Sequence, residues 1–181
     1  MLVGQYRARD LLLVPCLLSA ARVPLAAVFP LLIESPPAAL GVVVASGVTD
    51  VADGWIARRT GKVTATGAAL DPVTDKIFVA TVVVTLVLAH RLSVLDVLLL
   101  SSREIGELPL VLWVLCSSAA RRRRTQHPMA NVPGKLVTSL QFATIAAALF
   151  GSPLVAPLVY ATAVVGVAAA ATYWQRALRT S

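Results

Sequence analysis

Charged residues are scarce in this chain of 181 residues, where they make up 14% of the sequence. Ordinary soluble domains contain about 25% charged residues, whereas 57% of this chain is hydrophobic and its mean hydropathy is +0.80. So few polar residues would leave much of a small water-soluble domain's surface apolar. The composition therefore argues against a soluble globular protein, a disordered protein and a coiled coil. It predicts an integral membrane protein with a single domain over residues 1–181.

Cysteine is also scarce, since Cys16 and Cys116 are the two thiols of the chain. Both lie in apolar stretches, and their spacing matches neither a metal-binding nor a redox motif, so we expect buried, reduced thiols. No cleavable signal peptide is apparent, because the first apolar stretch has the length of a span and contains Arg22. The formal net charge is +7. In a membrane protein this excess indicates loops that face anionic membrane lipids, and we expect no nucleic-acid partner.

Long runs without charge predict the membrane-spanning helices. Between Lys135 and Arg176 lie 40 residues without a formal charge, and the cluster Phe150–Pro153 divides them in two. A helical span needs about 20 mostly apolar residues. The sequence therefore predicts an all-α integral membrane protein with six transmembrane helices. We place them at about residues 11–33, 38–58, 69–90, 93–120, 136–151 and 153–173.

Basic residues indicate the orientation of these spans. They cluster before the first span, between the second and third, between the fourth and fifth, and after the sixth, whereas the other connections are poor in positive charge. The positive-inside rule then places both termini in the cytoplasm. We expect a multi-pass protein of the cell membrane, and we interpret Arg121–Arg124 as a topology anchor that contacts lipid headgroups.

Four aspartates within 26 residues form the pattern that is most informative about chemistry: Asp50, Asp53, Asp71 and Asp75. The members of each pair are three or four residues apart, so each pair shares one face of a helix. A short connection that contains glycine would let the two helices lie antiparallel with the four carboxylates together. Such carboxylates would repel one another unless a divalent cation bound them. The plainer alternative is a set of solvated carboxylates at helix ends, with Asp71 as a cap.

The ligand types narrow the choice of cation. Oxygen ligands without histidine or cysteine favour Mg²⁺, Mn²⁺ or Ca²⁺ over zinc, and Mg²⁺ is usually shared with substrate phosphates. Gly54 and Gly67 would let a ligand approach the backbone closely, although Gly54 could instead serve tight helix packing. Ala57 keeps the same helix face small, and Arg58 supplies a cation for a phosphate.

These residues together resemble a known family. The pattern D-x2-D-G-x2-A-R-x8-G-x3-D-x3-D, matched without a gap from Asp50 to Asp75, resembles the signature of the CDP-alcohol phosphotransferases, also called CDP-alcohol phosphatidyltransferases. PCLLSAAR at Pro15–Arg22 is similar to the first-helix pattern P-N-x-x-T-x-x-R of this family. GKLVTSLQ at Gly134–Gln141 and the pair Arg103-Glu104 resemble the phosphatidylglycerophosphate synthase branch.

The chain departs from these patterns at three positions. Cys16 stands where the family has Asn, Ser19 where it has Thr, and Val137 where it has a second Lys. Ser19 keeps a hydroxyl, whereas Cys16 lacks the amide. The departures leave the aspartate motif intact and weaken the assignment of the acceptor.

The resemblance implies a reaction in which an alcohol attacks the β-phosphorus of CDP-diacylglycerol and CMP leaves. It implies a site for Mg²⁺ or Mn²⁺, with two ions, that opens to the cytoplasm. The metal ligands would be Asp50, Asp53, Asp71 and Asp75, and Asp75 would also take the proton of the attacking hydroxyl. The cytidine diphosphate pocket would be shaped by Gly54, Ala57, Arg58, Thr64 and Gly67, with Ser19 assisting from the first helix.

The remaining cations are candidates for contact with the acceptor alcohol. Arg22, Arg103 and Lys135 could hold an acceptor phosphate, although Arg103 could instead pair with Glu104 or Glu107, and Lys135 could snorkel at a helix end. The best acceptor is sn-glycerol 3-phosphate, which would give phosphatidylglycerophosphate. Relatives in the family use inositol phosphate, serine or phosphatidylglycerol. A homodimer is left open.

A cation transporter is the alternative from another class, because intramembrane carboxylates also carry ions. The four motif aspartates cluster at one membrane face, however, and no ladder of charges crosses the predicted bilayer. Inverted repeats with broken helices in matching positions are also lacking. These features favour the enzyme.

Overall fold

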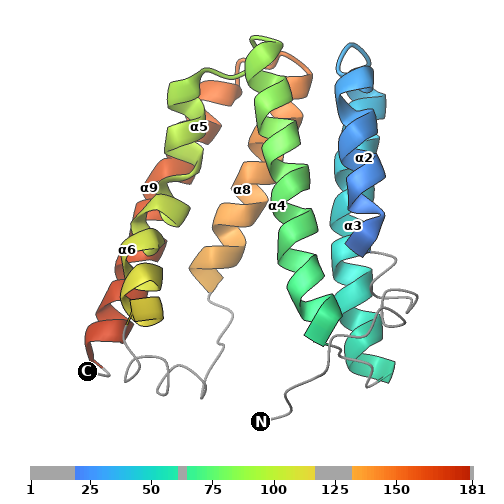
Figure 1. Cartoon of the computed structure of the whole chain (residues 1–181). Helices are drawn as coiled ribbons and strands as arrows, with labels where there is room; N and C mark the ends of the chain where they lie inside the picture. Colours follow the sequence, from blue (N-terminus) through green and yellow to red (C-terminus); the bar gives the residue numbers. More distant parts are fainter. Residues whose placement is uncertain (1–18, 61–64, 117–131, 180–181) are drawn as a thin grey trace. The chain divides into compact units, whose positions relative to one another are not determined.

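The computed structural model describes residues 19–60, 65–116 and 132–179, and within these ranges every element is a helix (Figure 1). No strand occurs among the described residues, so the prediction of an all-α protein is confirmed for this part of the chain. The chain separates into two compact units, residues 1–90 and residues 91–181.

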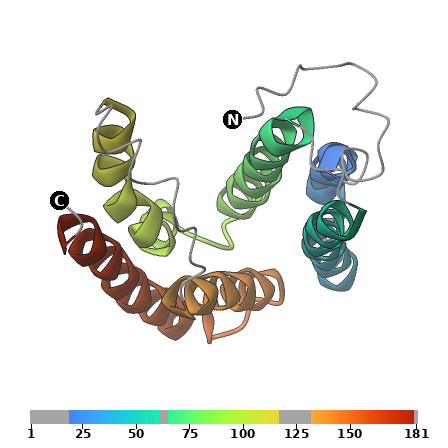
Figure 2. The same ribbon diagram turned by 90° about the horizontal axis from the view of Figure 1, so that it is seen from below.

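The described part of the first unit contains three helical segments. Helix α2 (Arg22–Val28) continues directly into the 3-10 helix η2 (Phe29–Leu32), which has a proline in its first turn. Helix α3 (Pro36–Thr60) and helix α4 (Ala65–Leu88) follow. Helix α2 packs against both α3 and α4 (Figures 1 and 2). The buried apolar side chains of this unit include Ala26, Phe29, Val43, Val82 and Leu86.

The second unit is organised around its last helix. Helices α5 (Val94–Leu100), α6 (Ser102–Cys116) and α8 (Val132–Leu149) all pack against α9 (Val155–Arg179), which Figure 2 shows in red. Two small-residue positions bring α6 and α9 close together. A Cβ atom placed on Gly106 would lie 2.8 Å from Cβ of Ala170, and one placed on Gly166 would lie 2.5 Å from Oγ of Ser102.

The predicted division between the last two spans is confirmed as a tight turn. Gly151 has a φ of +61°, in the left-handed region that glycine adopts without steric cost. The backbone N–H of Ser152 donates to the carbonyl of Ala147, so the turn provides a donor for one of the last carbonyls of α8. Arg91 Nη1 donates to the Leu149 carbonyl at 3.0 Å, which satisfies another carbonyl of this helix end.

The predicted span at about residues 93–120 is not one continuous helix. Ser101, with φ −87° and ψ 10°, separates α5 from α6. Helix α5 begins at a capping box, in which the Ser93 side chain accepts from the N–H of Asp96 and the Asp96 carboxylate accepts from the N–H of Ser93. Asp96, which lies near the start of the predicted span, thus satisfies a helix N-terminus.

In the part of the chain that the structure describes, fewer helices are long and apolar enough to span a membrane than the six predicted. Among the described residues, Val155–Gln175 is the one segment that is both long and apolar enough to cross a membrane. Shorter apolar helices occupy Arg22–Leu32, Pro36–Ala52 and Gly134–Leu149. The six spans and the orientation of the termini therefore stay predictions.

Candidate functional site

The aspartate motif lies on two continuous helices of the first unit. Helix α3 carries Asp50 and Asp53, and helix α4 carries Asp71 and Asp75. Both pairs lie within continuous helical backbone. The structure is therefore consistent with the prediction that the two aspartates of each pair share one helix face. The connection that contains Thr64 lies outside the described residues.

The structure describes the side chains of Asp50 and Asp75 among the four aspartates, and both side chains are exposed. Among the described residues no three His, Cys, Asp or Glu side chains lie close enough together to hold a metal ion. The predicted convergence of four carboxylates therefore stays a prediction. The side chains at six predicted site positions lie outside the described part: Asp53, Gly54, Ala57, Arg58, Gly67 and Asp71.

Arg22 of α2 reaches the first aspartate of the motif. Its Nη2 atom donates to Oδ1 of Asp50 at 2.7 Å, across 28 residues of sequence. The Arg22 side chain is 0% exposed, whereas the Asp50 side chain is 54% exposed. Ser19, one turn earlier, is also buried. Of the two first-helix residues that the sequence singled out, Arg22 thus contacts the aspartate motif, and one observed partner of Arg22 is a carboxylate of this protein.

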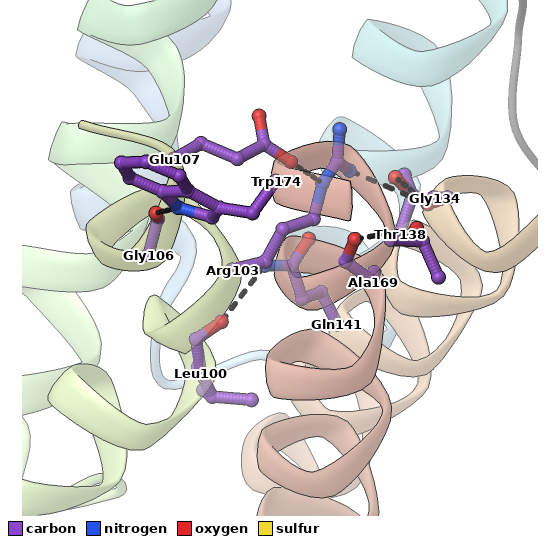
Figure 3. A network of polar contacts seen from close by, with 10 residues as sticks. Leu100, Arg103, Gly106, Glu107, Gly134, Thr138, Gln141, Ala169 and Trp174 are labelled. Atoms are coloured by element: carbon purple, nitrogen blue, oxygen red, sulfur yellow. Dashed lines mark hydrogen bonds and ion pairs between the residues drawn. The ribbon is translucent and has the colours of Figure 1, made fainter. Parts of the chain in front are cut away.

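A second polar cluster lies in the other unit, around Arg103 of α6 (Figure 3). Arg103 Nε donates to Oε1 of Glu107 at 2.9 Å, and Nη1 donates to the carbonyl of Gly134 at 3.4 Å. The Arg103 Cζ atom lies 5.9 Å from the ring centroid of Tyr173, within the range of a cation–π interaction. The guanidinium is therefore held by α6, α8 and α9 together.

The side chains around Arg103 satisfy carbonyls at irregular points of the helices. Gln141 Nε2 donates to the carbonyl of Leu100, at the end of α5, at 3.0 Å. Trp174 Nε1 donates to the carbonyl of Gly106 at 2.9 Å. Figure 3 shows both bonds beside Arg103.

The sequence predicted part of this second cluster. It singled out Arg103 and the tract from Gly134, and the structure brings the two together. Of the two carboxylates considered for Arg103, the structure shows the pair with Glu107. Lys135 is exposed. Sequence reasoning missed Tyr173 and Trp174, although aromatic side chains near the end of an apolar run are typical of a membrane interface.

Comparisons with known proteins agree with the motif. Residues 12–174 match the family described as CDP-alcohol phosphatidyltransferase. A rat protein named cardiolipin synthase (CMP-forming) is 36% identical over 104 residues, which cover 56% of this chain and 34% of the rat protein. A Pseudomonas fluorescens protein named CDP-diacylglycerol--glycerol-3-phosphate 3-phosphatidyltransferase is 42% identical over 82 residues, or 42% of each chain.

A third relative covers more of the chain. A Mycobacterium tuberculosis protein (strain CDC 1551 / Oshkosh), named probable phosphatidylglycerophosphate synthase, is 36% identical over 122 residues, which cover 67% of this chain and 54% of that protein. The chain spans about a third of the length of the rat cardiolipin synthase and of its human counterpart. The family match extends through both compact units and contains the whole aspartate motif. The chain belongs to the CDP-alcohol phosphatidyltransferase family.

Proposed function

We propose that the protein transfers the phosphatidyl group of CDP-diacylglycerol to an alcohol and releases CMP. The observation that carries this proposal is the run of eight motif positions from Asp50 to Asp75, which match the family signature without a gap. Helices α3 and α4 present these positions in two helical registers. The family match over residues 12–174 supports the same reaction and a single domain over residues 1–181.

The donor set fits a hard divalent cation. The motif supplies four carboxylates, and the Asp50 side chain is more than half exposed although one of its oxygens accepts from Arg22. We propose that Asp50, Asp53, Asp71 and Asp75 hold Mg²⁺ or Mn²⁺, with two ions. Bound there, the ions would neutralise the diphosphate of the donor and the charge that develops on the departing CMP.

Individual residues then have separate roles in the reaction. Asp75 accepts the proton of the acceptor hydroxyl. The hydroxyl oxygen of the acceptor forms a bond to the β-phosphorus, and the bond from that phosphorus to CMP breaks. Arg58 donates to the phosphates. The other positions that would shape the cytidine diphosphate pocket are Ser19, Gly54, Ala57, Thr64 and Gly67.

For the acceptor we propose sn-glycerol 3-phosphate. Support comes from the names of the Pseudomonas and Mycobacterium relatives and from the tract Gly134–Gln141. Arg103 and Lys135 are the cations that we propose bind its phosphate. The phosphate would then replace Glu107 as the partner of Arg103. The acceptor contact suggested for Arg22 would require Arg22 to leave Asp50 in the same way.

A second acceptor has specific support. The rat and human relatives are named cardiolipin synthases, and cardiolipin formation uses phosphatidylglycerol as the alcohol in the family. We therefore keep phosphatidylglycerol as the alternative acceptor.

For the membrane we propose the six-span arrangement with both termini and the active site on the cytoplasmic side of the cell membrane. The uncharged run from residue 136 to residue 175 and the alternation of basic connections support this arrangement. The apolar helix Val155–Gln175 supports it too. Formation of a homodimer is left open.

An acceptor screen tests the proposal. Purified protein in detergent is given CDP-diacylglycerol and Mg²⁺, and CMP release is measured with sn-glycerol 3-phosphate, phosphatidylglycerol, inositol phosphate and serine in separate reactions. We expect the fastest release with sn-glycerol 3-phosphate. Fastest release with phosphatidylglycerol would select the alternative. No release with any alcohol, together with cation flux in liposomes, would favour a transporter.

A further inference from the structure

The arginine of the first helix is placed in an unusual environment. The Arg22 side chain is fully buried, and so is Ala26 one turn later in α2. Removing a guanidinium from water is costly unless a carboxylate and further hydrogen bonds compensate for it. Arg22 nevertheless extends from α2 to α3, where it meets Asp50 at 2.7 Å. A short, charge-assisted bond of this kind fixes the geometry of both side chains.

The contact engages one oxygen of the Asp50 carboxylate, and the side chain stays more than half exposed. Arg22 Nη2 binds Oδ1, whereas the Asp50 side chain as a whole is 54% exposed. Thr49, the neighbour of Asp50, bonds back to the carbonyl of Ser46 at 2.8 Å and so keeps to its own helix. The direction of the second oxygen of Asp50 is therefore set by the bond from Arg22.

We propose that Arg22 is a positioning residue, which holds the Asp50 carboxylate in the orientation that binds the divalent cation. The inference rests on the proposed function, because it needs Asp50 to be a metal ligand. Hydrogen bonds from outer partners orient ligating carboxylates in metal sites generally, and their loss weakens metal affinity by roughly 10–100-fold. In this role Arg22 acts through Asp50 and does not touch the substrate.

A purely electrostatic role for Arg22 predicts the opposite effect on metal affinity. A positive charge beside a ligand repels the cation, so removing that charge would tighten metal binding. The charge of Arg22 is already paired with the Asp50 carboxylate at 2.7 Å, so the pair as a whole repels a cation little, whereas the hydrogen bond still fixes the orientation of the carboxylate. We therefore expect the loss of orientation to outweigh the relief of repulsion.

The test measures metal binding without substrate. Mn²⁺ is titrated into purified full-length protein in detergent, with no nucleotide and no alcohol, and free Mn²⁺ is followed by electron paramagnetic resonance. Arg22→Gln should raise the Kd for Mn²⁺ by roughly 10–100-fold. Arg22→Lys, which keeps the charge but loses the planar fork, should also raise it, by less.

A matched control removes another arginine that spans two elements. Arg91 donates to the Leu149 carbonyl at 3.0 Å, in the unit without the aspartate motif. Arg91→Gln should leave the Kd for Mn²⁺ unchanged. Thermal unfolding of each variant shows that it is folded, and Arg22→Lys serves if Arg22→Gln does not fold.

The outcomes separate this inference from the proposed function. If Asp50→Asn loses Mn²⁺ binding while either folded Arg22 variant binds as tightly as the wild type or more tightly, the positioning role is wrong and the metal site stands. If the Arg22 variants change only the KM for the acceptor, Arg22 is an acceptor contact and the inference is also wrong. If the wild type does not bind Mn²⁺, the proposed metal site fails, and the inference fails with it.

Discussion

The close approach of α6 and α9 predicts a large effect from one added methyl group. A Cβ atom on Gly106 would lie 2.8 Å from Cβ of Ala170, and Ala170 is 6% exposed. Ordinary carbon contacts lie at about 3.5–4.0 Å. Neither methyl group can rotate away, so Gly106→Ala must separate the two helix backbones by most of 1 Å, on the order of that difference.

The expected cost follows from overpacking. Extra methylene or methyl groups in a packed interior destabilise by about 1–3 kcal/mol, and separation of the helices also strains the bond from Trp174 Nε1 to the Gly106 carbonyl, which is 2.9 Å long. For a chain of this length, 1 kcal/mol corresponds to about 2–4 °C in Tm. Gly106→Ala should therefore lower the Tm in detergent by roughly 2–12 °C.

A control and a rescue make this prediction specific. Gly41 in α3 has no atom within 4 Å of an added Cβ, so Gly41→Ala should cause no loss and should gain up to about 1 kcal/mol in helix propensity. The double variant Gly106→Ala with Ala170→Gly removes the clashing methyl group and should recover most of the lost Tm.

The measurement is thermal unfolding of five proteins: the Gly41→Ala control and the four members of a double-mutant cycle for Gly106 and Ala170. The reasoning is refuted if Gly106→Ala has the same Tm as Gly41→Ala, or if adding Ala170→Gly does not raise the Tm of Gly106→Ala. Either result would mean that the helices do not touch at this point.

Further predictions concern the chemistry and the topology. Excess EDTA should abolish CMP release and Mg²⁺ or Mn²⁺ should restore it, because the motif offers oxygen ligands alone; full turnover in EDTA would reject the metal site. Asp75→Asn should lower kcat roughly 10²–10⁴-fold while CDP-diacylglycerol affinity stays near the wild-type value, whereas Asp53→Asn should weaken that affinity. Wild-type kcat in Asp75→Asn would exclude it as the base. A cysteine placed near Lys62 should be labelled from the cytoplasmic side and one at Ser35 from the opposite side; labelling of both from one side would contradict the six-span topology.

Local signals in the sequence predicted their parts of the fold well. The turn at Gly151 was predicted because glycine, serine and proline interrupt an uncharged run, and each of these residues acts on its own backbone. The start of α5 was also predicted, because the fourth span was placed from about residue 93, where Ser93 and Asp96 form a capping box. The interruption at Ser101 was missed, because no glycine or proline marks it in the sequence.

Contacts between distant residues were harder to predict. For Arg22 the sequence offered an acceptor phosphate as the partner, and for Arg103 it offered either that phosphate or a carboxylate of the chain. The observed partners are the Asp50 carboxylate and the Gly134 carbonyl, which lie 28 and 31 residues away in the sequence, so each contact depends on how two helices meet. Periodicity within one helix carries no information on such pairs.

The central place of α9 in the second unit has a consequence for how this protein is made. Helices α5, α6 and α8 all pack against α9, and α9 is the last of them to be synthesised. Until Val155–Arg179 has left the ribosome, the three earlier helices lack their common packing surface. The first unit has no such delay, because α2, α3 and α4 pack within residues 22–88. Biogenesis should therefore proceed in two stages, and a chain interrupted before Val155 should yield a folded first unit with three unassembled helices behind it.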